Sequence, residues 1–133
     1  MLTANAIAYF REIVTRAAWE LAYAEHEMII CRRKLSFVRE IVRRGGFPTE
    51  ITIDAGDRND EGDATCLTVE EYAAWLIDDA RQGIKYHEDK IPAAHAAFAC
   101  VRLLIDHLEL TEIDPDEILR EQQAIMELER PLR

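Results

Sequence analysis

The sequence predicts an all-α protein built on a long antiparallel helical hairpin of coiled-coil type, with a short third helix that completes a helical bundle. Apolar residues recur at alternating steps of three and four along two regions of nearly equal length, which is the pattern of two paired helices. The chain has 133 residues, 49% of them apolar and 32% charged. This composition is typical of a folded protein and fits one domain, residues 1–133.

The first helix is predicted over residues 3–44, where neither Pro nor Gly interrupts an apolar seam. Gly45 and Gly46 predict its end, because glycine adopts the backbone conformation that closes a helix, and Pro48 follows just beyond. The seam positions are Ile7, Phe10, Val14, Ala17, Leu21, Ala24, Met28, Cys31, Leu35, Val38 and Val42.

Residues 45–67 have no sustained period and are rich in turn-forming residues, so they predict an acidic loop, with one very short strand near Ile51 and Ile53. From Asp57 onward the spacing partly matches a calcium-binding loop. The twelfth position is Thr68, where that loop needs a bidentate Glu. We therefore expect no metal here, and no cofactor elsewhere.

The second helix is predicted over residues 68–109, opened by Thr68 and Glu71 at capping-box spacing and kinked or briefly broken near Pro92. The third helix is predicted over residues 115–129, with Asp114 as its N-terminal cap. The seam of the second helix is Val69, Ala73, Leu76, Ala80, Ile84, His87, Ile91, Ala94, Phe98, Val101, Ile105 and Leu108.

The charges of the two long helices also favour an antiparallel hairpin. Residues 32–44 carry six basic and one acidic side chain, whereas residues 68–80 carry four acidic side chains and no basic one. Folding back would place these stretches side by side, where opposite charges attract.

Several large apolar side chains lie off both seams, and a short third helix cannot cover them all. The sequence therefore predicts self-association, as a homodimer that buries the leftover surface. The residues expected to mediate it are Trp19, Ile30, Phe37, Ile41 and Trp75.

The net charge of −10 disfavours binding to nucleic acid and favours a basic partner. Spaced carboxylates on a helical rod can imitate a nucleic-acid backbone, as in small phage-encoded inhibitors of defence systems. We therefore expect a non-enzymatic, acidic protein-interaction module that occupies a basic, nucleic-acid-binding surface of its partner. The expected contact residues are Asp54, Asp57, Asp60, Glu61, Asp63, Asp78, Asp79, Glu88 and Asp89, with the carboxylates of the third helix.

Two alternatives remain open at this point. Arg81 with His87, and Arg102 with His107, have spacings similar to those of the HEPN ribonucleases, in which Arg and His meet at a dimer interface. Neither pair shares one helix face, so a nuclease site would need the partner subunit to complete it. The other alternative is a structural adaptor, or a helical dimer that binds RNA through the basic end of the first helix.

Three cysteines without paired spacing, Cys31, Cys66 and Cys100, predict reduced thiols and a cytoplasmic protein. No apolar stretch is long enough to span a membrane, so we expect no membrane partner.

Overall fold

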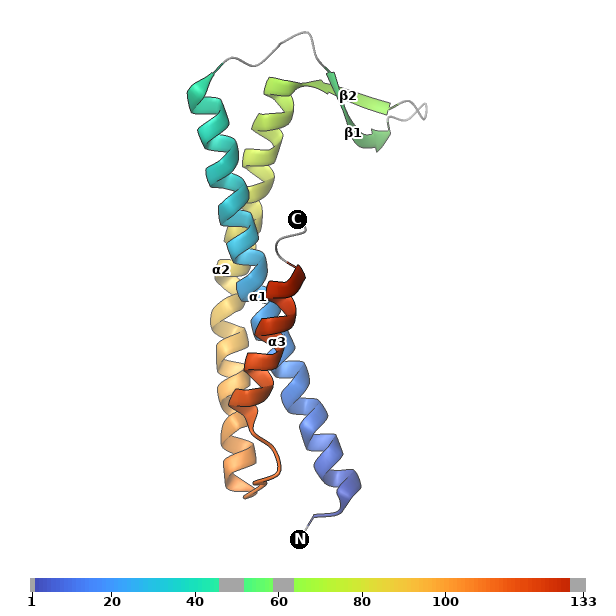
Figure 1. Ribbon diagram of the computed structural model, residues 1–133, viewed down its shortest axis with the longest axis vertical. Helices are drawn as coiled ribbons and strands as arrows, with labels where there is room; N and C mark the ends of the chain where they lie inside the picture. The colour runs from blue at the N-terminus through green and yellow to red at the C-terminus, as the bar shows by residue number, and fades with distance from the viewer. Residues whose placement is uncertain (1, 46–51, 59–63, 130–133) are drawn as a thin grey trace. The chain divides into compact units, whose positions relative to one another are not determined.

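The computed structural model describes residues 2–45, 52–58 and 64–129, and it confirms the all-α fold (Figure 1). Helix α1 (Ala4–Arg44) packs against α2 (Val69–His107) and α3 (Pro115–Glu129). Each helix begins and ends within two residues of its predicted bounds. A small hairpin of β1 (Thr52–Arg58) and β2 (Ala64–Thr68) lies between α1 and α2 in the chain.

The structure divides the predicted single domain into two compact units. Unit 1 contains residues 1–30 and 85–133, and unit 2 contains residues 31–84. Both long helices contribute to both units, whereas α3 belongs to unit 1 alone.

Unit 1 has a core to which all three helices contribute. Leu21 of α1, Phe98 of α2 and Ile118 of α3 are all buried there, with Leu110 and Ile113 from the connection between α2 and α3. Burial of these apolar side chains is the main stabilising term of the unit. The predicted seams are therefore correct in this unit, because the seam residues from Ile7 to Met28 and from Ile91 to Leu108 are all buried or half-buried.

In unit 2 the contact between α1 and α2 depends on small residues. Val38, Ala73 and Ala80 are buried, and Gly83 lies against Cys31. A Cβ atom built on Gly83 would be 2.6 Å from the Cys31 Sγ, so glycine is what allows this approach. The first seam ends earlier than predicted, because Val42 is 44% exposed.

The predicted helix ends are confirmed by their hydrogen bonds. At the start of α2, the Thr68 amide donates to Glu71 Oε1 at 3.0 Å, and the Glu71 amide donates to Thr68 Oγ1 at 3.1 Å. Asp114 Oδ1 accepts from the amides of Asp116 and Glu117 at the start of α3. These bonds satisfy amides that have no partner inside the helix.

The end of α2 was not predicted in detail. Glu109 has a φ of +55°, its amide donates to the Asp106 carbonyl, and the Leu110 amide donates to the Ile105 carbonyl. This is a Schellman motif with Glu where glycine is usual. It turns the chain so that Leu110 enters the core of unit 1.

The loop predicted over residues 45–67 contains a β-hairpin in its described part, residues 52–58 and 64–67. Strands β1 and β2 are antiparallel, with Thr52 opposite Thr68 and Ile53 opposite Leu67, and the register shifts between Asp54 and Arg58. The sequence indicated a first short strand near Ile53, but its partner strand begins more than ten residues later. Local periodicity does not indicate such pairing, because the two strands are matched only to each other and lie in separate segments of the chain.

Helix α2 continues through Pro92, so the predicted break is absent from this described stretch. Because proline has no amide hydrogen, Pro92 cannot donate a helical hydrogen bond, and the surrounding helix tolerates this loss. None of the helices described here is long and apolar enough to cross a membrane.

Candidate functional site

The acidic residues predicted to bind a partner fall into two groups. Asp78, Asp79, Glu88 and Asp89 are exposed on α2, and Asp78 accepts a hydrogen bond from Gln82 at 2.8 Å. Asp54 and Asp57 lie in β1. The other predicted residues, Asp60, Glu61 and Asp63, lie outside the described residues. The structure thus presents four of the nine carboxylates at the surface of a regular helix.

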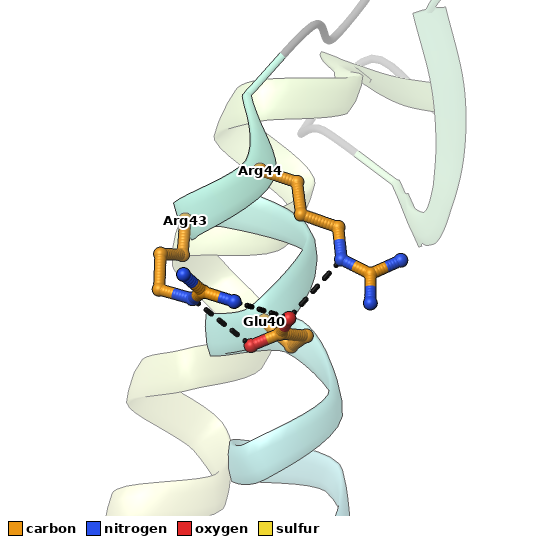
Figure 2. A network of polar contacts seen from close by, with 3 residues as sticks. All are labelled: Glu40, Arg43 and Arg44. Carbon is orange, nitrogen blue, oxygen red and sulfur yellow. Dashed lines mark hydrogen bonds and ion pairs between the residues drawn. The ribbon is translucent and has the colours of Figure 1, made fainter.

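At the C-terminal end of α1, Glu40 organises a small ionic network (Figure 2). Arg43 donates to both Glu40 oxygens, at 2.6 and 3.1 Å, and Arg44 Nε donates to Oε1 at 3.1 Å. Hydrogen bonds from Arg43 and Arg44 lower the pKa of Glu40, and the same contact raises the pKa of Arg43. Two of the six basic side chains in residues 32–44 therefore bind an acid of their own helix.

The predicted self-association residues differ in exposure. Phe37 is 67% exposed, Trp75 is 48% exposed and Trp19 is 45% exposed, so each offers apolar surface. Ile41 is half-buried. Ile30 is buried, with 7% of its surface exposed, so unlike the other four it offers almost no surface to a second copy.

Unit 1 contains a groove between α1 and α2, with a volume of about 410 Å³, which we call the aromatic groove. Alanines form part of its lining, and exposed aromatic rings stand beside them. The residues that line it are Trp19, Glu20, Tyr23, Ala24, Tyr86, His87, Lys90, Ala93, Ala94 and Ala97.

The aromatic side chains of the groove are arranged in two sets. Trp19 and Tyr23 stack on each other, with ring centroids 4.9 Å apart and planes 11° apart. On α2, the Lys90 ammonium lies 5.2 Å from the centroid of the Tyr86 ring, a cation–π contact. The groove thus combines faces that attract cations with the carboxylate of Glu20.

Of these groove residues, the sequence identified Trp19 as exposed and placed Ala24, His87 and Ala94 on the seams. It did not identify Tyr23, Tyr86 or Lys90 as members of a site. One signal was available, since Ala93 and Ala97 follow each other at helical spacing in an alanine-rich stretch. Helices come closest where such small residues face a neighbour.

The Arg/His pairs are placed as follows. The guanidinium of Arg102 binds the carboxylate of Asp116 and lies 5.0 Å from the Phe98 ring centroid, so it links α2 to α3. His107 is exposed in the last turn of α2. His87 lines the aromatic groove, and its Nδ1 is buried without a hydrogen-bond partner among the residues that the structure describes. Arg81 is exposed.

Within the described residues, no group of three or more His, Cys, Asp or Glu side chains is placed to hold a metal ion. The Thr68 hydroxyl, which would occupy the last position of a calcium loop, instead caps α2.

No protein family, curated protein or solved structure matches this chain.

Proposed function

We propose that this chain is a non-enzymatic helical interaction module that binds a basic surface of a partner protein through its carboxylates. The observation that supports this most is the exposure of Asp78, Asp79, Glu88 and Asp89 on α2, in a chain with a net charge of −10. Opposite charge steers such a surface to its partner and fixes the orientation of the complex.

The partner surface is one that ordinarily holds nucleic acid, because carboxylates exposed along a helix present negative charge where a phosphate backbone would lie. The module then acts as an inhibitor that excludes nucleic acid from that surface. It works as a homodimer in the cytoplasm, where its exposed apolar rings are covered by a second copy.

The test uses a panel of purified nucleic-acid-binding proteins, titrated against the fluorescently labelled chain in low and high salt. We expect the binding to weaken as salt rises and duplex nucleic acid to compete with the chain for the partner. Binding should be lost when Asp78, Asp79 and Asp89 become Asn and Glu88 becomes Gln. The labelled chain reports binding by its fluorescence anisotropy.

A matched control neutralises four other acids, namely Glu12, Asp106, Glu109 and Glu112. This variant has the same net charge as the first, and we expect it to bind nearly as well as the wild type. Equal losses in the two variants would mean that only net charge matters. Failure of the wild-type chain to bind any member of the panel would reject the proposed function.

A further inference from the structure

We propose that the aromatic groove of unit 1 is a self-association site that receives a basic helical segment, residues 32–39, from a second copy of this chain. The inference rests on the proposed homodimer and identifies the surfaces that form it. Phe37 of one copy enters the groove of the other, and the basic side chains beside Phe37 meet the aromatic faces and Glu20.

The groove has the chemistry to receive such a segment. Its volume of about 410 Å³ is in the range of pockets that hold small organic molecules, which is enough room for one phenylalanine ring. Ala93 and Ala97 are exposed at its surface, so a helix can approach without displacing large side chains. Lys90 already lies over the ring of Tyr86, so the rings of Trp19 and Tyr23 and the carboxylate of Glu20 are the groups that would meet the incoming cations.

The basic segment has the matching features. Arg32, Arg33, Lys34 and Arg39 are all exposed, and the segment contains no acidic residue. Arg33 and Lys34 lie four and three residues before Phe37, so all three side chains share one helix face. Phe37 is 67% exposed, whereas phenylalanine side chains are usually buried. This exposure is what a second copy would remove.

The neighbouring ion pairs leave this segment available. Arg43 and Arg44 bind Glu40, whereas the charge of residues 32–39 is unbalanced within the segment. Unit 1 supplies the opposite charge, with fifteen acidic and eight basic residues. A second copy therefore brings a positive segment with one exposed ring to a negative unit with an aromatic groove, and burial of the ring adds to the electrostatic attraction.

The experiment is sedimentation equilibrium of the full chain over a range of concentrations, in low and high salt. We expect a mass of about twice 15.3 kDa, with self-association that weakens as salt rises. Phe37→Ala should weaken it about tenfold or more, as loss of a central aromatic anchor does. Ala97→Arg, which fills the groove and repels the basic segment, should have an effect of similar size.

Matched variants separate the site from its surroundings. Ala96→Arg adds the same side chain one residue away, at an exposed position that does not line the groove, and should leave association unchanged. Arg33→Glu and Glu20→Arg should each weaken association, and the double variant should restore much of it. Circular dichroism melting confirms that each variant is folded.

The outcomes separate this inference from the proposed homodimer. A monomer at every concentration would reject both. A dimer that is lost with Phe37→Ala but unaffected by Ala97→Arg would keep the homodimer and overturn the groove as its site. If Phe37→Ala and Ala97→Arg both weaken the dimer but the double variant Arg33→Glu with Glu20→Arg does not restore it, the pairing of Arg33 with Glu20 would be overturned.

Discussion

Units 1 and 2 are built on the same two helices, yet they bury different kinds of side chain. In unit 1 the buried residues include Leu21, Phe98, Ile105 and Ile118, which are large. Among the described residues of unit 2, the buried ones are Val38, Ala73 and Ala80, which are small.

The difference comes from α3. Two helices alone can bury only the narrow strip where they touch, and small residues bring them close together there. A third helix covers a wider apolar face, so large side chains become fully buried. The stability of the chain should therefore come mainly from unit 1, while unit 2 should be more sensitive to steric changes at its narrow contact.

The largest expected effect is in the core of unit 1. Leu21 is 1% exposed, so Leu21→Ala should lower the free energy of unfolding by about 3 kcal/mol. Leu35 of unit 2 is half-buried, so Leu35→Ala should cost only about 1 kcal/mol. Urea denaturation followed by circular dichroism measures both. Equal losses would contradict the contrast between the two units.

The second effect is steric and lies in unit 2. An alanine at position 83 would place its Cβ 2.6 Å from the Cys31 Sγ. We expect Gly83→Ala to cost about 1–2 kcal/mol, although alanine is the better helix former. Cys31→Ala in the same chain should relieve the clash, so the costs of the two changes should not add in a double-mutant cycle. Additive costs would mean that the two residues do not touch.

The third effect tests where α2 begins. Thr68→Ala removes the side-chain acceptor for the Glu71 amide and should cost about 1 kcal/mol. Thr111→Ala, an exposed threonine outside the helices, should change stability by less than about 0.5 kcal/mol. Thermal melts of the two variants provide the measurement. Equal melting temperatures would mean that the Thr68 cap does not stabilise the protein.

The same cap predicts a pH dependence. Hydrogen bonds from Thr68 lower the pKa of Glu71 below its ordinary value of 4.5. Because the pKa of Glu71 is lower in the folded state than in the unfolded state, the ionised carboxylate stabilises the fold above pH 4.5. This stabilisation is lost as the pH falls through the pKa that Glu71 has in the folded state. Wild type should therefore lose its advantage over Glu71→Gln in denaturation measured between neutral and strongly acidic pH. An advantage that persists in acid would refute this assignment.

The smallest effect is at the other end of α2, in unit 1. Glu109 has a φ of +55°, where a residue with a Cβ is strained. Glu109→Gly should raise stability by about 0.5 kcal/mol, since the relief of strain is partly offset by the greater freedom of glycine in the unfolded chain. Glu109→Ala retains the strain and should give no such gain. Calorimetric melting of the two variants decides the point.

Much of the fold could be predicted because its signals are local. The seams predicted both long helices, and Thr68, Glu71, Asp114 and Gly45 predicted where helices begin and end. Such signals depend on residues a few positions apart, so the sequence displays them directly. The β-hairpin was missed because its two strands identify each other only by pairing.

The candidate site was less predictable. Trp19 was recognised as a residue without an obvious place in the core, but Tyr23, Tyr86 and Lys90 gave no signal of their own. They form a groove only because α1 and α2 bring them together from positions more than sixty residues apart. Ile30 shows the opposite error, since it lies off the predicted seam and is nevertheless buried.

The sequence by itself determined the class of fold, the lengths of the helices, the residues that cap them and the excess of negative charge. It could do so because periodicity, capping and charge depend on residues that are close together in the chain. Only the tertiary structure decided which half of the hairpin acquires a third helix, which exposed rings surround a groove, and which arginines are already paired with Glu40. These properties depend on contacts between distant segments, and a contact is determined by the packing of whole helices rather than by any one stretch of the chain.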